Sequence, residues 1–189
     1  IAPSDFTVAT EDYALSRRLY LYLPRKPENP PAREFAKFAV SAAAQDVVKS
    51  QGFVSQEVFA TPYQPGKHYP AEARKLTEGS QRLSVNIRFE PDGISLDNKA
   101  KRDLDRVGDM LRKKGQLKEG LMLFGFAADD GAPVVMNLER SSRTAHLAGD
   151  YLREKGVWVF KTRGYGTAAP VASNNTALCS SSPQSKPTT

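Results

Sequence analysis

Hydrophobic positions in the second half of the chain follow a rhythm of alternating strands and helices. Residues 83–89 place apolar side chains at every second position, which predicts a strand with one inward face. Asp97 is a suitable N-cap, and apolar residues at i, i+4, i+7 and i+11 after it predict a helix. The apolar run 120–126, the helical pattern 136–155 and the run 157–165 complete a β-α-β-α-β order. That order favours an α/β (α+β) fold with helices packed on a mixed sheet.

The first half of the chain has a different pattern. Residues 19–23 alternate leucine with tyrosine, which predicts a strand with both faces at least partly covered, ending at Pro24. A helix is expected over residues 32–40. A second helix is expected to begin after the N-cap Ser41 and to end at Gly52, a residue suited to the position after a helix.

The two halves are joined by a stretch that is rich in proline and glycine. Residues 59–80 contain few apolar side chains and are predicted to be a linker, with a short helical turn at 71–76. We therefore expect one domain at 1–58 and another at 81–178. The polar, proline-containing end, residues 179–189, is predicted to be a disordered tail.

Charge and composition narrow the classes of function. The net charge is +6 and the pI is near 9.4, but acidic residues interrupt most of the short basic groups, such as Arg112–Lys114. A mixed-charge surface without interleaved aromatic residues argues against nucleic-acid binding. The single cysteine, Cys179, excludes an internal disulfide, and no apolar stretch is long enough for a transmembrane helix.

Candidate catalytic chemistry is sparse. The two histidines, His68 and His146, lack metal-ligand spacing, and no nucleophile–base pair is visible in the sequence. We therefore expect a protein that is not an enzyme and needs no metal or cofactor.

Several motifs occur in a fixed order from Leu83 to Leu178. They include Ile87-Arg-Phe89 followed by Leu96-Asp-Asn, then Leu123-Phe-Gly-Phe126, and then a helix that contains Asn137 and Arg143. The final blocks are Arg163-Gly-Tyr-Gly166 and Pro170-Val-Ala-Ser-Asn-Asn-Thr-Ala177. Together they resemble the OmpA-like peptidoglycan-binding domain, which also occurs in peptidoglycan-associated lipoproteins and motor-protein stators. After Leu178 the sequence departs from that family, whose final strand has no counterpart in 179–189.

The first half resembles the C-terminal end of a periplasmic phosphate-type solute-binding protein of an ABC transporter. The matching segments are Leu15-Ser-Arg-Arg-Leu-Tyr20, Ala32-Arg-Glu-Phe35 and Gln51-Gly-Phe-Val54. The resemblance implies a fragment of a type II periplasmic-binding lobe, with phosphate or another small anion as ligand of the full-length protein. It also implies a location in the periplasm or envelope of a Gram-negative-type bacterium, and a start of the natural protein that lies upstream of Ile1.

The OmpA-like resemblance implies a ligand and a site. The ligand is the diaminopimelate residue of the peptidoglycan stem, whose amine is held by an aspartate and whose carboxylate is held by an arginine. The family pattern places the aspartate where this chain has Ala128, so a one-residue slip assigns the role to Asp129. Asn137 is expected to hold the loop, and Arg143 to bind the carboxylate, with Arg140 as its substitute.

These residues also have simpler interpretations. An Asp-Asp-Gly run in a loop is usually only a turn, and arginines on a helix face are usually solvated. Asp130 is expected to be dispensable. The whole pattern predicts a non-catalytic envelope protein whose OmpA-like domain anchors a phosphate-type receptor to peptidoglycan. The alternative is a phosphate or solute transport receptor in which that domain is only structural.

Overall fold

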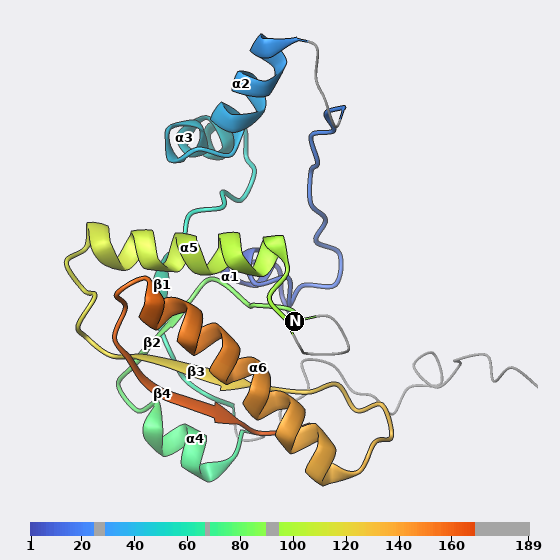
Figure 1. Cartoon of the computed structure of the whole chain (residues 1–189), viewed down its shortest axis with the longest axis vertical. Helices are drawn as coiled ribbons and strands as arrows, with labels where there is room; N and C mark the ends of the chain where they lie inside the picture. Colours follow the sequence, from blue (N-terminus) through green and yellow to red (C-terminus); the bar gives the residue numbers. More distant parts are fainter. Residues whose placement is uncertain (25–28, 67–68, 90–94, 169–189) are drawn as a thin grey trace, which may run out of the picture. The chain divides into compact units, whose positions relative to one another are not determined.

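The computed structural model describes residues 1–24, 29–66, 69–89 and 95–168, and it forms two compact units (Figure 1). Unit 1 comprises residues 1–63, 79–88 and 97–117, and unit 2 comprises 64–78, 89–96 and the chain from 118 onward. Unit 1 contains α1 (Asp5–Ala9), α2 (Pro30–Ala39), α3 (Ala42–Ser50), β1 (Ala60–Pro62), β2 (Gln81–Leu83) and α5 (Asn98–Lys113). Unit 2 contains α4 (Ala71–Leu76), β3 (Leu121–Gly125), α6 (Val134–Glu154) and β4 (Val159–Gly164).

Unit 2 is built around one β-α-β unit. Strands β3 and β4 pair in parallel, with Leu123 opposite Thr162 and an irregularity between Leu121 and Met122. Parallel strands need a crossover connection, and α6 supplies it; Figure 1 shows this helix lying along the two strands. The buried apolar side chains of this layer come from α6, from the turn after it and from β4: Ala145, Ala148, Leu152, Val157 and Val159.

Helix α5 is the main amphipathic element of unit 1. Asp97 caps it, since its carboxylate oxygen Oδ1 accepts a hydrogen bond from the backbone N–H of Ala100 at 2.6 Å. The helix buries Ala100, Leu104 and Val107 on one face. This spacing confirms the helix predicted from the sequence.

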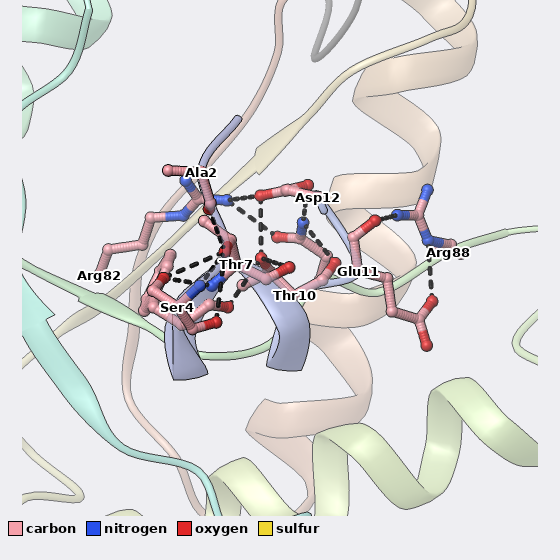
Figure 2. A network of polar contacts seen from close by, with 10 residues as sticks. Ala2, Ser4, Thr7, Thr10, Glu11, Asp12, Arg82 and Arg88 are labelled. Atoms are coloured by element: carbon pink, nitrogen blue, oxygen red, sulfur yellow. Dashed lines mark hydrogen bonds and ion pairs between the residues drawn. The ribbon is translucent and has the colours of Figure 1, made fainter. Parts of the chain in front are cut away.

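A network of polar contacts connects the N-terminal segment to β2 and to the chain after it (Figure 2). The carboxylate of Asp12 accepts hydrogen bonds from the Thr10 hydroxyl at 2.9 Å, from Arg82 at 3.2 Å and from Asn86 at 3.0 Å. Arg88 donates hydrogen bonds to Glu11, both to its side-chain carboxylate and to its backbone carbonyl. Six residues therefore connect residues 10–12 to residues 82–88, through hydrogen bonds that each involve a side chain and without strand pairing.

Two predicted strands are wrong in whole or in part. Residues 19–23 form no strand, and all five side chains are exposed, with Tyr22 88% exposed. No strand lies beside them in the part of the chain that the structure describes, so the predicted covering is absent. Of the predicted strand 83–89, only Leu83 belongs to β2, which pairs with β1 in antiparallel register. The N–H of Ser84 adds one further backbone hydrogen bond, to the carbonyl of Phe59 at 2.9 Å. Beyond it, Asn86 and Arg88 contact the N-terminal segment through their side chains.

The remaining elements follow the sequence closely. The four helices expected at 32–40, 42–51, 71–76 and 98–114, and the one at 136–155, are all confirmed with small shifts at their ends. The strands expected at 120–126 and 157–165 are also confirmed. The α/β class is therefore confirmed, but the predicted mixed sheet is wrong for the described residues, in which β1–β2 and β3–β4 form two separate two-stranded sheets. The solute-binding lobe and the domain boundaries at 58 and 81 stay predictions.

Several predicted features lie outside the described residues. These are His68, the motif 170–177, Cys179 and the tail 179–189. Among the described helices, none has both the length and the apolar character that a membrane crossing requires.

Candidate functional site

The candidate site lies where β3 ends and α6 begins. Residues 126–133 connect the two elements, at the edge where the carboxyl ends of β3 and β4 meet. In open α/β sheets, ligands bind preferentially outside the carboxyl ends of the parallel strands. The Asp-Asp-Gly sequence singled out above falls within this connection.

Two glycines allow α6 to approach the strands at this edge. A Cβ atom on Gly125 would lie 1.9 Å from the carbonyl oxygen of Ser141, and one on Gly164 would lie 2.2 Å from the backbone nitrogen of Ser142. The Ser141 hydroxyl donates to the carbonyl of Leu138 at 2.9 Å and accepts from the N–H of Gly166 at 2.9 Å. The start of α6 is therefore fixed against the ends of both strands.

The connection itself is organised by its own side chains. The carboxylate of Asp129 accepts from the N–H of Gly131 at 3.3 Å, and that of Asp130 accepts from the N–H of Ala132 at 3.1 Å. Gly131 has φ +78°, a backbone conformation that favours glycine. The Asn137 side chain donates to the carbonyl of Ala132 at 3.3 Å. The loop is thus a pair of side-chain-capped turns that is attached to α6.

The two candidate arginines have different partners. Arg140 Nη1 lies 2.8 Å from Asp130 Oδ2, so it bridges α6 and the loop. The hydrogen bond from Arg140 lowers the pKa of the Asp130 carboxyl, with help from the N–H of Ala132. Arg143 instead pairs with Glu139 at 3.0 Å, within the helix.

Helix geometry explains this difference. At about 100° per residue, Arg143 lies roughly 200° around the helix axis from the buried Ser141. It therefore faces away from the strands, and its side chain is exposed. Arg140 lies roughly 100° from Ser141, at the border of the buried face, which brings it within reach of the loop.

Two buried polar atoms near this edge have no hydrogen-bond partner among the described residues: Asn137 Oδ1 and the Tyr165 hydroxyl. Asn137 is only 2% exposed. Burial raises the pKa of the Tyr165 phenol and the charge of Glu72 adds to the rise, while Arg163 opposes it. The Tyr165 ring stacks on Phe126 with 5.9 Å between centroids. Unsatisfied buried groups are rare in native proteins and commonly mark a place for water or ligand.

The side chains at this junction offer groups that are complementary to a small zwitterion. The Asp129 carboxylate is exposed and, among the described residues, pairs with no cation, so it can accept from an ammonium group. A guanidinium from α6 can donate to a carboxylate in a forked geometry. No group of three or more His, Cys, Asp or Glu side chains among the described residues could hold a metal ion.

The sequence located part of this arrangement. It pointed to Asp129, Asn137 and the two arginines, and the structure brings Asp129, Asn137 and Arg140 to one loop–helix junction while Arg143 lies apart from it. The Asp130–Arg140 pair was missed, since the two residues are ten positions apart and no local spacing rule connects them. Their roles toward a ligand stay predictions.

Comparison with known proteins places this junction in a family. Residues 88–181 match the model of the OmpA family. No curated protein matches the chain. The matched segment contains the whole β3-α6-β4 unit, the loop with Asp129 and both arginines. The chain therefore carries an OmpA-family domain at residues 88–181.

Proposed function

We propose that this chain is a non-catalytic protein of the cell envelope that binds peptidoglycan through its OmpA-family domain. The family is known for peptidoglycan binding, which supports an envelope role. The observation that carries the proposal is the junction at the start of α6. There an exposed carboxylate, Asp129, lies in the same short loop whose other aspartate is paired with a helix arginine.

The ligand that suits this junction is the diaminopimelate residue of a stem peptide. One of its carbons carries both an ammonium and a carboxylate group. Asp129 would accept from the ammonium, and an arginine of α6 would donate to the carboxylate, either Arg143 by its spacing in the sequence or Arg140 by its position beside the loop. Asn137 would hold the loop through the carbonyl of Ala132.

A finer role is the anchoring of a phosphate-type solute receptor to the cell wall. Its support is the resemblance of residues 1–58 to such a receptor. The exposed leucines and tyrosines of residues 19–23 are what a strand of a larger lobe would present. The alternative function is solute reception alone, with an OmpA-family domain that is only structural.

Retention on purified sacculi tests the proposal and separates the two functions. We expect the chain to be retained by sacculi and released by free diaminopimelate. Asp129→Ala should weaken retention about tenfold, because a charge-assisted hydrogen bond to the ligand is lost. Asp150→Ala is a matched control, since Asp150 is an exposed α6 aspartate paired with Arg153 at the far end of the helix.

Two results would count against peptidoglycan binding. Wild-type protein that is not retained would favour the structural role of the domain. Retention that free diaminopimelate does not compete away, and that Asp129→Ala leaves unchanged, would show that the wall is held by another surface.

A further inference from the structure

The ion pair between Arg140 and Asp130 has a specific layout. Among the described residues, only the Nη1 atom of Arg140 has a polar partner, which is Asp130 Oδ2. The other oxygen of Asp130 accepts from the N–H of Ala132. Asp130 is therefore fixed by the loop backbone on one side and holds the guanidinium on the other.

We propose that Arg140 is the residue that binds the ligand carboxylate, and that Asp130 is a positioning residue that aims the Arg140 guanidinium across the loop. The inference rests on the proposed function, because it names which groups of that site hold which end of the ligand. It also reverses the expectation that Asp130 is dispensable.

The chemistry of guanidinium makes the two contacts compatible. The group carries five N–H donors in a planar fork, so one nitrogen can hold Asp130 while a separate edge holds a ligand carboxylate. The Arg140 side chain is 31% exposed, so part of it is accessible to a ligand from solvent. Holding a long side chain in place before binding reduces the entropy that the ligand must offset.

The alternative arginine is less well placed. Arg143 projects from the side of α6 that faces away from β3 and β4, and it pairs with Glu139 on its own helix. Among the described residues its guanidinium makes no hydrogen bond to the Asp129–Ala132 loop. It is thus on the far side of the helix from the carboxylate that would take the ammonium.

A second observation points to a ligand at the same junction. Asn137 is buried and its Nδ2 atom bonds the carbonyl of Ala132, the residue whose N–H holds Asp130. Its Oδ1 atom has no partner among the described residues. A buried acceptor left open beside this loop can accept from the ligand ammonium, or from a water that accompanies it, once the loop adjusts.

Discrimination between two stem peptides tests the assignment. One peptide ends in diaminopimelate with a free carboxylate, and the other carries the same group as an amide. We expect wild-type protein to prefer the free acid by about tenfold or more, because a charge-assisted fork is lost in the amide. Arg140→Ala should bring the ratio close to one, and Arg140→Lys should keep part of it. Arg153→Ala, on the same helix, is the control and should keep the whole ratio.

Asp130→Asn isolates the positioning role. Asparagine can still accept from the N–H of Ala132, so the turn is kept while the charge that holds Arg140 is removed. We expect a lower ratio of free-acid to amide binding with an unchanged melting temperature. A merely structural role of Asp130 would instead weaken binding of both peptides equally.

The outcomes separate the two levels of inference. If wild-type protein binds neither peptide nor sacculi, the proposed function fails. If it binds but does not discriminate, or if Arg143→Ala and not Arg140→Ala removes the discrimination, the proposed function stands and the assignment of Arg140 is overturned. An unchanged ratio in Asp130→Asn overturns the positioning role alone.

Discussion

At the scale of single residues, the absence of side chains at two glycines positions the candidate site. Gly125 and Gly164 end β3 and β4, and each meets the backbone of α6 at Ser141 or Ser142. Backbone atoms cannot rotate out of the way as a side chain can. The contact between α6 and the two strands therefore depends on glycine at both positions. The location of Asn137 and Arg140 beside the loop depends on the same contact.

Gly164→Ala should destabilise unit 2. The new methyl group would lie 2.2 Å from the backbone nitrogen of Ser142, so the helix must shift, at a cost of about 1–3 kcal/mol or more. Gly149→Ala offers a graded comparison, because its methyl meets a side-chain methyl of Thr162 at 2.7 Å and it gains helix propensity. Urea unfolding measures both variants. Equal losses for the two would show that the backbone contact at Gly164 is not the tighter constraint.

At the scale of elements, side-chain caps decide how firmly a helix begins. Asp97 accepts from the N–H of Ala100 at the start of α5, so Asp97→Ala should cost about 1 kcal/mol. Ser41 precedes α3 but makes no side-chain cap; its hydroxyl donates backward to the carbonyl of Phe38. Ser41→Ala should therefore cost less than Asp97→Ala when both are unfolded thermally. The reverse order would contradict this reading of the caps.

The elements also show how far the sequence alone reaches. Helices α2, α3, α4, α5 and α6 were predicted because caps and apolar spacing are local signals. The strand predicted at 19–23, and most of the one predicted at 83–89, are absent from the structure. A strand forms only beside a partner strand, and the alternation of apolar residues does not reveal whether a partner is present. Short α1, with its capping box between Ser4 and Thr7, was overlooked although Ser4 and Asp5 are local start signals.

The same reasoning applies to the candidate site. Asp129 and Asn137 could be picked out from the sequence because a turn and the helix after it are neighbours along the chain. The choice between Arg140 and Arg143 could not be made, since it depends on which side of α6 faces the strands. That orientation is fixed by contacts of Ser141 with Gly125, Gly164 and Gly166, residues far from it in sequence.

At the scale of the whole molecule, the two units depend on carboxylates to different degrees. Unit 1 gathers Glu11 and Asp12 against Arg82 of β2 and Arg88 after it, and Asp12 is almost fully buried there (Figure 2). In the unit 2 ion pairs Arg140–Asp130 and Arg163–Glu72, each side chain is between about a third and a half exposed. Exposed pairs contribute little to stability. Acid should therefore weaken unit 1 before unit 2.

The final prediction concerns Glu11. Burial alone would raise the pKa of its carboxyl, but the hydrogen bond and charge of Arg18, with the charges of Lys99 and Arg88, lower it. A lowered folded-state pKa means that this contribution to stability is present above the unfolded pKa and is lost as the pH falls through the folded one. The loss begins near pH 4.5, the ordinary value of this group, and continues below it.

Glu11→Gln should make unit 1 less stable at pH 7, by about 1 kcal/mol or less because the carboxylate is only partly buried. It should also flatten the fall in stability between neutral pH and pH 3, since the group that titrates is gone.

Far-UV circular dichroism in urea measures the unfolding of both units. Emission from Trp158, the only tryptophan and a residue of unit 2, follows that unit separately. Glu34→Gln, whose pair with Lys37 is exposed, is the control. If the free energy of unfolding falls with pH equally steeply in wild type and in Glu11→Gln, the network around Glu11 does not govern the acid response. Removal of the Glu11 charge would then have left the pH dependence of stability unaltered.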